Sequence, residues 1–125
     1  MNITTNINPN TPTVPVAKAI EALKVSRLTH SVFYTPCIDI LYGAEDVFAR
    51  KVKQPDTIGE IEDFIIDEAY NYVFGCWEND LASPGSEDYS FAVEIIATVV
   101  LACFTGNKIE IACAVYNALD FYGEF

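Results

Sequence analysis

The chain has 125 residues, and its 18 acidic residues against 7 Lys or Arg give it a formal net charge of −11. Hydrophobic residues make up 51% of the sequence, which is enough for one folded domain and too many for a disordered acidic tail. The negative field of such a chain repels nucleic acid and anionic membranes, so the composition argues against binding to either and favours basic protein partners.

The acidic residues are concentrated after Gln54. Residues 1–54 carry six Lys or Arg and four Asp or Glu, a balance of +2, whereas residues 55–125 carry fourteen Asp or Glu and one cation, Lys108, a balance of −13. One cation cannot neutralise so many carboxylates by ion pairing within this part of the chain. We therefore expect it to present an acidic surface.

The first thirteen residues contain no charged side chain, two prolines and many Asn and Thr residues. Because this composition is typical of a flexible or extended arm, we expect residues 1–13 to form such an arm and residues 14–125 to form a single helical domain. No secretory signal pattern opens the chain. The most apolar stretch, residues 91–104, is shorter than the about 20 residues that cross a bilayer, so the sequence predicts a cytoplasmic protein.

Five helices follow from the spacing of apolar residues and from residues typical of helix ends. Thr35 is the expected N-cap of the second helix, and Thr57 and Glu60 fit a capping box at the start of the third. The predicted fold is all-α, a compact bundle of about five helices, in which a short turn makes the last two an antiparallel hairpin. The predicted ranges are 15–28, 36–51, 57–79 or 57–81, 86–104 and 107–122.

The fourth predicted helix is apolar on nearly every side from Phe91 to Phe104, apart from Glu94. Such a helix is either buried on most sides or shared across an oligomer interface, so a homodimer through residues 91–104 is one alternative. Glu94 is expected either at the one exposed edge of this helix or buried and paired with a cation. In a dimer, the basic cluster at residues 50–53 could meet the acidic surface of a second copy.

The third predicted helix carries the most specific pattern in the chain. Glu60, Asp63 and Asp67 are spaced i, i+3, i+7 and share one face, on which neighbouring carboxylates lie about 5–6 Å apart; Glu62 flanks them. Such a row can be a solvated surface, a docking face for Arg and Lys of a partner, or half of a divalent-metal site. Its spacing is comparable to that of backbone phosphates, so it could imitate nucleic acid.

Aromatic residues follow the acidic row on the same helix. Tyr70, Phe74 and Trp77 are spaced i, i+4, i+7 and form a second stripe, suited either to core packing or to a partner interface. Together with the flanking carboxylates they complete the expected partner-binding surface. Its residues are Glu60, Glu62, Asp63, Asp67, Tyr70, Phe74, Trp77, Glu78 and Asp80.

No motif in the chain names a reaction. His30 is the single histidine, so no Ser-His-Asp or Cys-His arrangement can be argued, and no glycine-rich phosphate loop occurs. The four cysteines form no C-x-x-C pair and are expected to be buried and reduced. A disulfide between the last two is an alternative. These cysteines are Cys37, Cys76, Cys103 and Cys113.

A metal-dependent enzyme is a further alternative. All-helical nucleotide pyrophosphohydrolases hold Mg²⁺ between acidic rows on two facing helices, but the second row would consist here of Glu87, Asp88 and Glu94 alone. Lys108 is the only cation in the acidic part that could meet substrate phosphates. We therefore expect no catalytic residue, no cofactor and no metal.

These patterns favour a small acidic inhibitor that occludes a basic, nucleic-acid-binding partner, such as a nuclease or a nuclease complex. Phage proteins that block host defence nucleases, of the anti-CRISPR or antirestriction type, match this size and charge by analogy. An immunity protein or antitoxin that neutralises a cationic nuclease toxin follows the same charge logic and is the nearest alternative.

Overall fold

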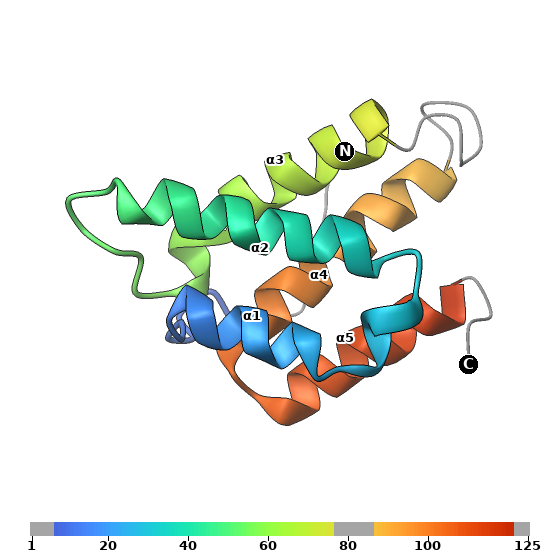
Figure 1. The fold of residues 1–125 in the computed structure, drawn as a ribbon, viewed down its shortest axis with the longest axis horizontal. Coiled ribbons are helices and arrows are strands. Elements are labelled where there is room, and N and C mark those ends of the chain that lie inside the picture. The colour runs from blue at the N-terminus through green and yellow to red at the C-terminus, as the bar shows by residue number, and fades with distance from the viewer. Residues whose placement is uncertain (1–6, 77–86, 122–125) are drawn as a thin grey trace.

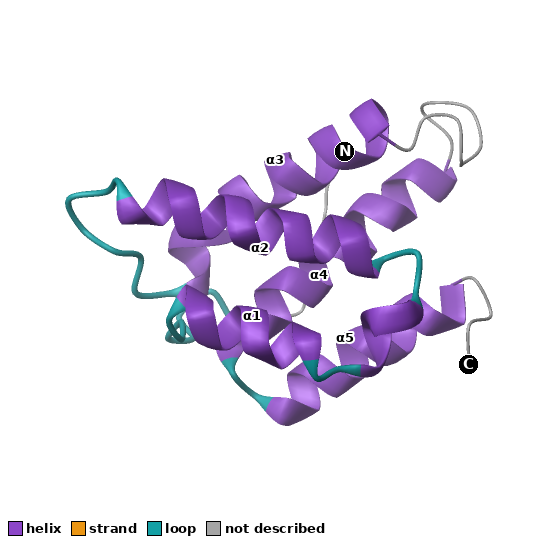
Figure 2. Ribbon diagram, in the orientation of Figure 1, coloured by secondary structure: helices purple, strands orange, loops and turns teal. Residues whose placement is uncertain are grey.

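The computed structural model describes residues 7–76 and 87–121. Within these ranges the fold consists of five α-helices and one short 3-10 helix, and no strand is present (Figures 1 and 2). The predicted all-α bundle is therefore confirmed. The elements are α1 (Val16–Lys24), η1 (Arg27–His30), α2 (Tyr34–Ala49), α3 (Ile58–Cys76), α4 (Glu87–Thr105) and α5 (Lys108–Phe121).

Helix α4 lies at the centre of the bundle and packs against α1, α2, α3 and α5 (Figure 1). Most of its side chains between Ala92 and Phe104 are buried, which accounts for its apolar character within one chain. A homodimer through residues 91–104 stays a prediction, and it would have to use the outward side chains of this helix, such as Phe91, which is 48% exposed. Glu94 is half-buried and forms no ion pair with any described residue, so it is neither fully exposed nor buried with a cation partner.

Two helix boundaries differ from the prediction: α1 ends four residues earlier than expected, and α2 begins two residues earlier. α1 ends at Lys24, because Ser26 accepts a hydrogen bond from Leu28 N at 3.2 Å and donates one to Leu23 O at 2.7 Å; a serine that bonds to nearby backbone groups competes with helix continuation. The next residues form η1 instead. α2 begins at Tyr34, so Thr35 lies in its first turn and is not the N-cap.

The turn between α4 and α5 follows the prediction. Gly106 ends α4 with a φ of 65°, and Asn107 caps α5 by accepting hydrogen bonds from Ile109 N at 2.9 Å and Glu110 N at 3.1 Å. Because only two residues separate the helices, α4 and α5 pack as the expected antiparallel hairpin.

Residues 7–13 lie against the start of α3. Ile58 N donates to Thr11 O and Gly59 N donates to Pro9 O, both at 2.9 Å, so carbonyl groups of this segment satisfy two amides that a helix N-terminus leaves without partners. A Cβ on Gly59 would lie 3.1 Å from Pro9 O, and glycine permits this close approach. The sequence predicted a flexible or extended arm at residues 1–13, and the structure adds these contacts for its second half.

The cysteines differ from one another in burial. Cys37 and Cys103 are buried, whereas Cys113 is exposed, and all three are free thiols. The alternative of a Cys103–Cys113 disulfide is therefore wrong, and so is the expectation that Cys113 is buried; the side chain of Cys76 lies outside the described residues. Burial raises the pKa of the Cys103 thiol to about 12 and that of Cys37 well above its usual value, because the thiolate form loses its hydration.

Candidate protein-binding surface on α3

Helix α3 separates an apolar side from an acidic side. Its apolar stripe is buried against α4 and α2, while Glu60, Asp63 and Asp67 are exposed on the opposite side of the helix. The 3.6-residue period of the helix makes this separation, because residues three and four apart lie on one face. The buried stripe consists of Ile58, Ile61, Ile65, Ala69 and Val73.

The spacing of apolar residues in this helix predicts a buried stripe of Ile58, Ile61, Ile65, Tyr72 and Cys76. The three isoleucines are buried, but Tyr72 is only half-buried, and the side chain of Cys76 lies outside the described residues. Ala69 and Val73 occupy the core positions at this end of α3 instead. Glu62 is also half-buried, so it lies at the edge of the buried stripe. The exposed acidic row is therefore narrower than the expected set of carboxylates.

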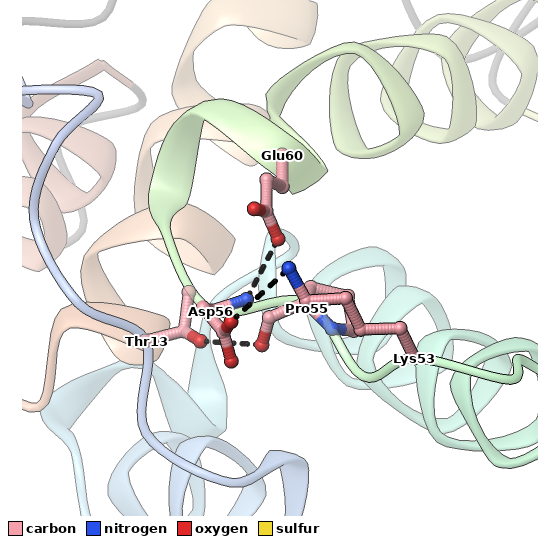
Figure 3. Close-up of polar contacts among 5 residues, drawn as sticks. All are labelled: Thr13, Lys53, Pro55, Asp56 and Glu60. Atoms are coloured by element: carbon pink, nitrogen blue, oxygen red, sulfur yellow. Dashed lines mark hydrogen bonds and ion pairs between the residues drawn. The ribbon is translucent and has the colours of Figure 1, made fainter.

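The first residue of the row, Glu60, already has a partner within the chain. Its Oε2 accepts a hydrogen bond from Asp56 N at 2.8 Å (Figure 3), one residue before the Thr57 amide that a capping box would use. Beside it, Lys53 Nζ lies 3.5 Å from Asp56 Oδ2, and Thr13 Oγ1 donates to Pro55 O at 3.1 Å. The carboxylate of Glu60 therefore anchors the start of α3.

Asp63 and Asp67 form no ion pair with any residue in the described part of the chain. The ion pairs there involve other carboxylates: Arg50 pairs with Asp46 at 3.0 Å, and Lys53 with Asp56 at 3.5 Å. Two cations of the basic cluster at residues 50–53 are thus paired locally. The cluster is accordingly less available to the acidic row of a second copy.

The aromatic side chains beyond the row lie on the same face of α3. Asp67, Tyr70 and Phe74 are spaced i, i+3, i+7, and the rings of Tyr70 and Phe74 stack with centroids 4.3 Å apart. Tyr70 is 42% exposed and Phe74 is half-buried against the core. The carboxylates and this aromatic pair form one continuous surface, which we call the α3 surface: Asp63, Asp67, Tyr70 and Phe74. Trp77, Glu78 and Asp80 lie outside the described residues.

Glu94 does not supply the second acidic row that a metal site between two helices requires. This side chain lines a cavity of about 310 Å³ between α4 and α5, together with Glu110 and Cys113, and not the side of α4 that packs on α3. Within residues 7–76 and 87–121, no three His, Cys, Asp or Glu side chains are grouped closely enough to hold a metal ion.

No helix in these ranges combines the length and the apolarity that crossing a membrane requires.

The chain matches no protein-family model, no curated protein and no solved structure. Its function must therefore be argued from its own residues.

The sequence pattern indicated the α3 surface but not a groove between α1 and α5. The cations of this groove come from three separate elements, so no spacing within one helix indicates it.

Proposed function

We propose that this chain is an inhibitor that binds a basic, nucleic-acid-binding protein through its acidic surface and blocks the groove of that protein. One observation carries the proposal: Asp63 and Asp67 are exposed carboxylates without an ion-pair partner among the described residues, and they lie beside a stacked aromatic pair. Arg or Lys of a partner would supply the missing charges. Tyr70 would supply an anchor of the type common at interface hot spots.

The charge of the whole molecule supports the same class of partner. A net charge of −11 raises the rate of encounter with basic proteins and repels nucleic acid. In this proposal the carboxylates of α3 occupy the sites that phosphates would otherwise fill. A phage protein directed against a defence nuclease and an immunity protein directed against a nuclease toxin would both use this mechanism, and the identity of the partner separates them.

The proposal is tested by affinity capture at low salt from a lysate of the cell in which the protein acts, with elution by a salt gradient. We expect to recover a basic nucleic-acid-binding protein, to release it as salt screens the contact, and to displace it with added nucleic acid. The variant Asp63→Lys with Asp67→Lys should abolish capture because it places cations opposite the cations of the partner.

The matched control is Asp39→Lys with Glu45→Lys, two exposed acidic residues on α2. This pair changes the net charge of the protein by the same amount and leaves the α3 surface intact. If both variants weaken capture equally, the loss of capture comes from the change in net charge and not from the α3 surface. Capture that neither salt nor the α3 variant affects would contradict the proposal.

A further inference from the structure

A long groove separates α1 from α5. Both helices pack against α4, and both lie wholly within the described residues, yet no Cα atom of α1 comes within 8 Å of one of α5. The groove has a volume of about 810 Å³. η1 contacts both helices and closes one end, while Val14 and Gly106 lie at the other. In Figure 1 the two helices run along the side of the molecule opposite α3.

The walls of the groove are mainly apolar. α1 contributes Ala22 and the adjoining Val25, and α5 contributes Val115, Tyr116 and Leu119. Val25 is 75% exposed and Tyr116 is 57% exposed, whereas Val115 and Leu119 are buried, so the apolar area open to solvent comes mainly from Val25 and Tyr116. Concave clefts of this volume with mainly apolar walls are typical of binding sites.

Cations border this apolar area. Lys18, Arg27 and Lys108 line the groove, against one carboxylate, Glu21, although acidic residues far outnumber cations in the chain. None of the three cations forms an ion pair with a described residue. Lys18 and Lys108 lie in the first turns of α1 and α5, at the Gly106 end, and Arg27 lies at the η1 end. Cations are therefore available at both ends of the groove.

The length and shape of the groove suit one helix. From Gly106 to Leu119 it follows α5 for about 20 Å at the rise of an α-helix, so it accommodates a helix of about 13 residues. A third helix laid between α1 and α5 would pack side chains into the space between theirs. Its apolar stripe would cover Val25 and Tyr116, and acidic residues at both ends would meet the three cations.

We propose that the groove between α1 and α5 binds an amphipathic helix of a partner protein, with acidic residues flanking its apolar stripe. A second copy of this chain is a poorer occupant, because the apolar stripe of α3, its most acidic described helix, is buried against α4. The groove uses no residue of the α3 surface, so this proposal stands or falls independently of the inhibitor proposal.

The test uses two labelled synthetic peptides of about 14 residues, both with leucine on one face and with either glutamate or glutamine at every polar position. Fluorescence anisotropy with the purified full-length protein measures both affinities, and the neutral glutamine peptide does not bind the α3 surface through charge. We expect the glutamate peptide to bind at least about tenfold more tightly than the glutamine peptide, even though the protein itself is acidic. Equal affinities, or no binding of the glutamate peptide at about 100 µM, would overturn the proposal.

Variants assign the binding to the groove. Lys18→Glu with Lys108→Glu should raise the dissociation constant of the glutamate peptide by about tenfold or more, whereas Lys51→Glu with Lys53→Glu changes the net charge equally outside the groove and should have a much smaller effect. Val25→Asp with Tyr116→Asp should also weaken binding, with Val52→Asp as the exposed control. Equal losses in the groove and control variants would refute the assignment.

Light scattering tests whether a second copy of this chain, and not a partner helix, occupies the groove. A monomer at micromolar concentration is the expected result. A dimer that Val25→Asp with Tyr116→Asp converts to a monomer would assign the groove to a second copy of the chain and would overturn the partner-helix proposal.

Discussion

Carboxylates of similar appearance in the sequence have different roles in the fold. The Glu60 carboxylate accepts a hydrogen bond from the Asp56 amide, whereas Asp63 and Asp67, three and seven residues later, point to solvent without an ion-pair partner in the described ranges. A carboxylate that bonds a free amide before a helix contributes to folding. One without such a contact is available to a partner. The two aspartates therefore carry the binding proposal, and Glu60 contributes mainly to stability.

The buried thiols provide a prediction at the residue scale. In the unfolded chain the Cys103 thiol titrates near its usual value of 9.0, and in the folded protein its pKa is about 12. Above pH 9 the unfolded state thus loses its proton first, so stability that is fully present below pH 9 falls as pH rises through the folded pKa. The slope is about 1.4 kcal/mol per pH unit for one thiol.

Chemical denaturation from pH 8 to about pH 11 measures this fall. Cys103→Ala should be less stable than the wild type at neutral pH through lost packing, but the difference between the two should narrow above about pH 9 because the variant lacks the thiol. Cys113→Ser, at an exposed position, should keep the wild-type slope. A constant difference between wild type and Cys103→Ala up to pH 11 would show that burial does not hold the proton on this thiol.

At the scale of helices, the local signal at the start of α5 was interpreted correctly, whereas the local signals at the end of α1 and the start of α2 were not. Asn107 caps α5 as expected, because an Asx side chain reaches the amides two and three residues later without help from distant parts of the chain. The start of α3 is different. Its first amides bond to Pro9 and Thr11, some fifty residues earlier, and no spacing within the helix indicates such a contact.

Two glycines provide a matched prediction for these elements. Gly106 has a φ of 65°, and a Cβ there would lie 2.6 Å from Val14 Cγ1, so Gly106→Ala should destabilise the protein by about 1–3 kcal/mol. Gly43 lies in α2, where an added Cβ meets nothing within 4 Å. Gly43→Ala should therefore stabilise the protein by about 0.5–1 kcal/mol.

Urea denaturation of both variants gives the two free energies of unfolding. The signs of the two changes should be opposite. A Gly106→Ala variant as stable as the wild type would mean that the turn accepts a side chain and that Val14 does not pack closely on it. A destabilised Gly43→Ala variant would mean that the space beside Gly43 is occupied.

At the scale of the molecule, the fold separates the α3 surface from the groove. The acidic surface lies on α3, and the cation-bordered groove lies between α1 and α5; α3 contacts neither of these two helices. α4, which packs against all three, separates the surfaces. Two surfaces of opposite charge could serve two different partners without mutual competition, and each can be altered without the other.

The same charge distribution predicts that binding and stability respond oppositely to one variant. Asp63→Lys with Asp67→Lys lowers the magnitude of the net charge from −11 and relieves repulsion along α3, so it should stabilise the protein by a few tenths of a kcal/mol at low salt. Thermal unfolding at low and high salt measures this, and the gain should disappear as salt screens the charges. A destabilised variant would mean that these carboxylates have partners within the fold.

The sequence by itself determined the all-α class, the apolar character of the helix at residues 91–104 and the shared face of Glu60, Asp63 and Asp67. These features depend on helical periodicity and on apolar content, which are properties of short segments. Tertiary packing decided that Tyr72 lies outside the core, that residues 7–13 cover the start of α3, and that Lys18, Arg27 and Lys108 border one groove. Such features depend on contacts between segments far apart in the chain, and local spacing carries no information about them.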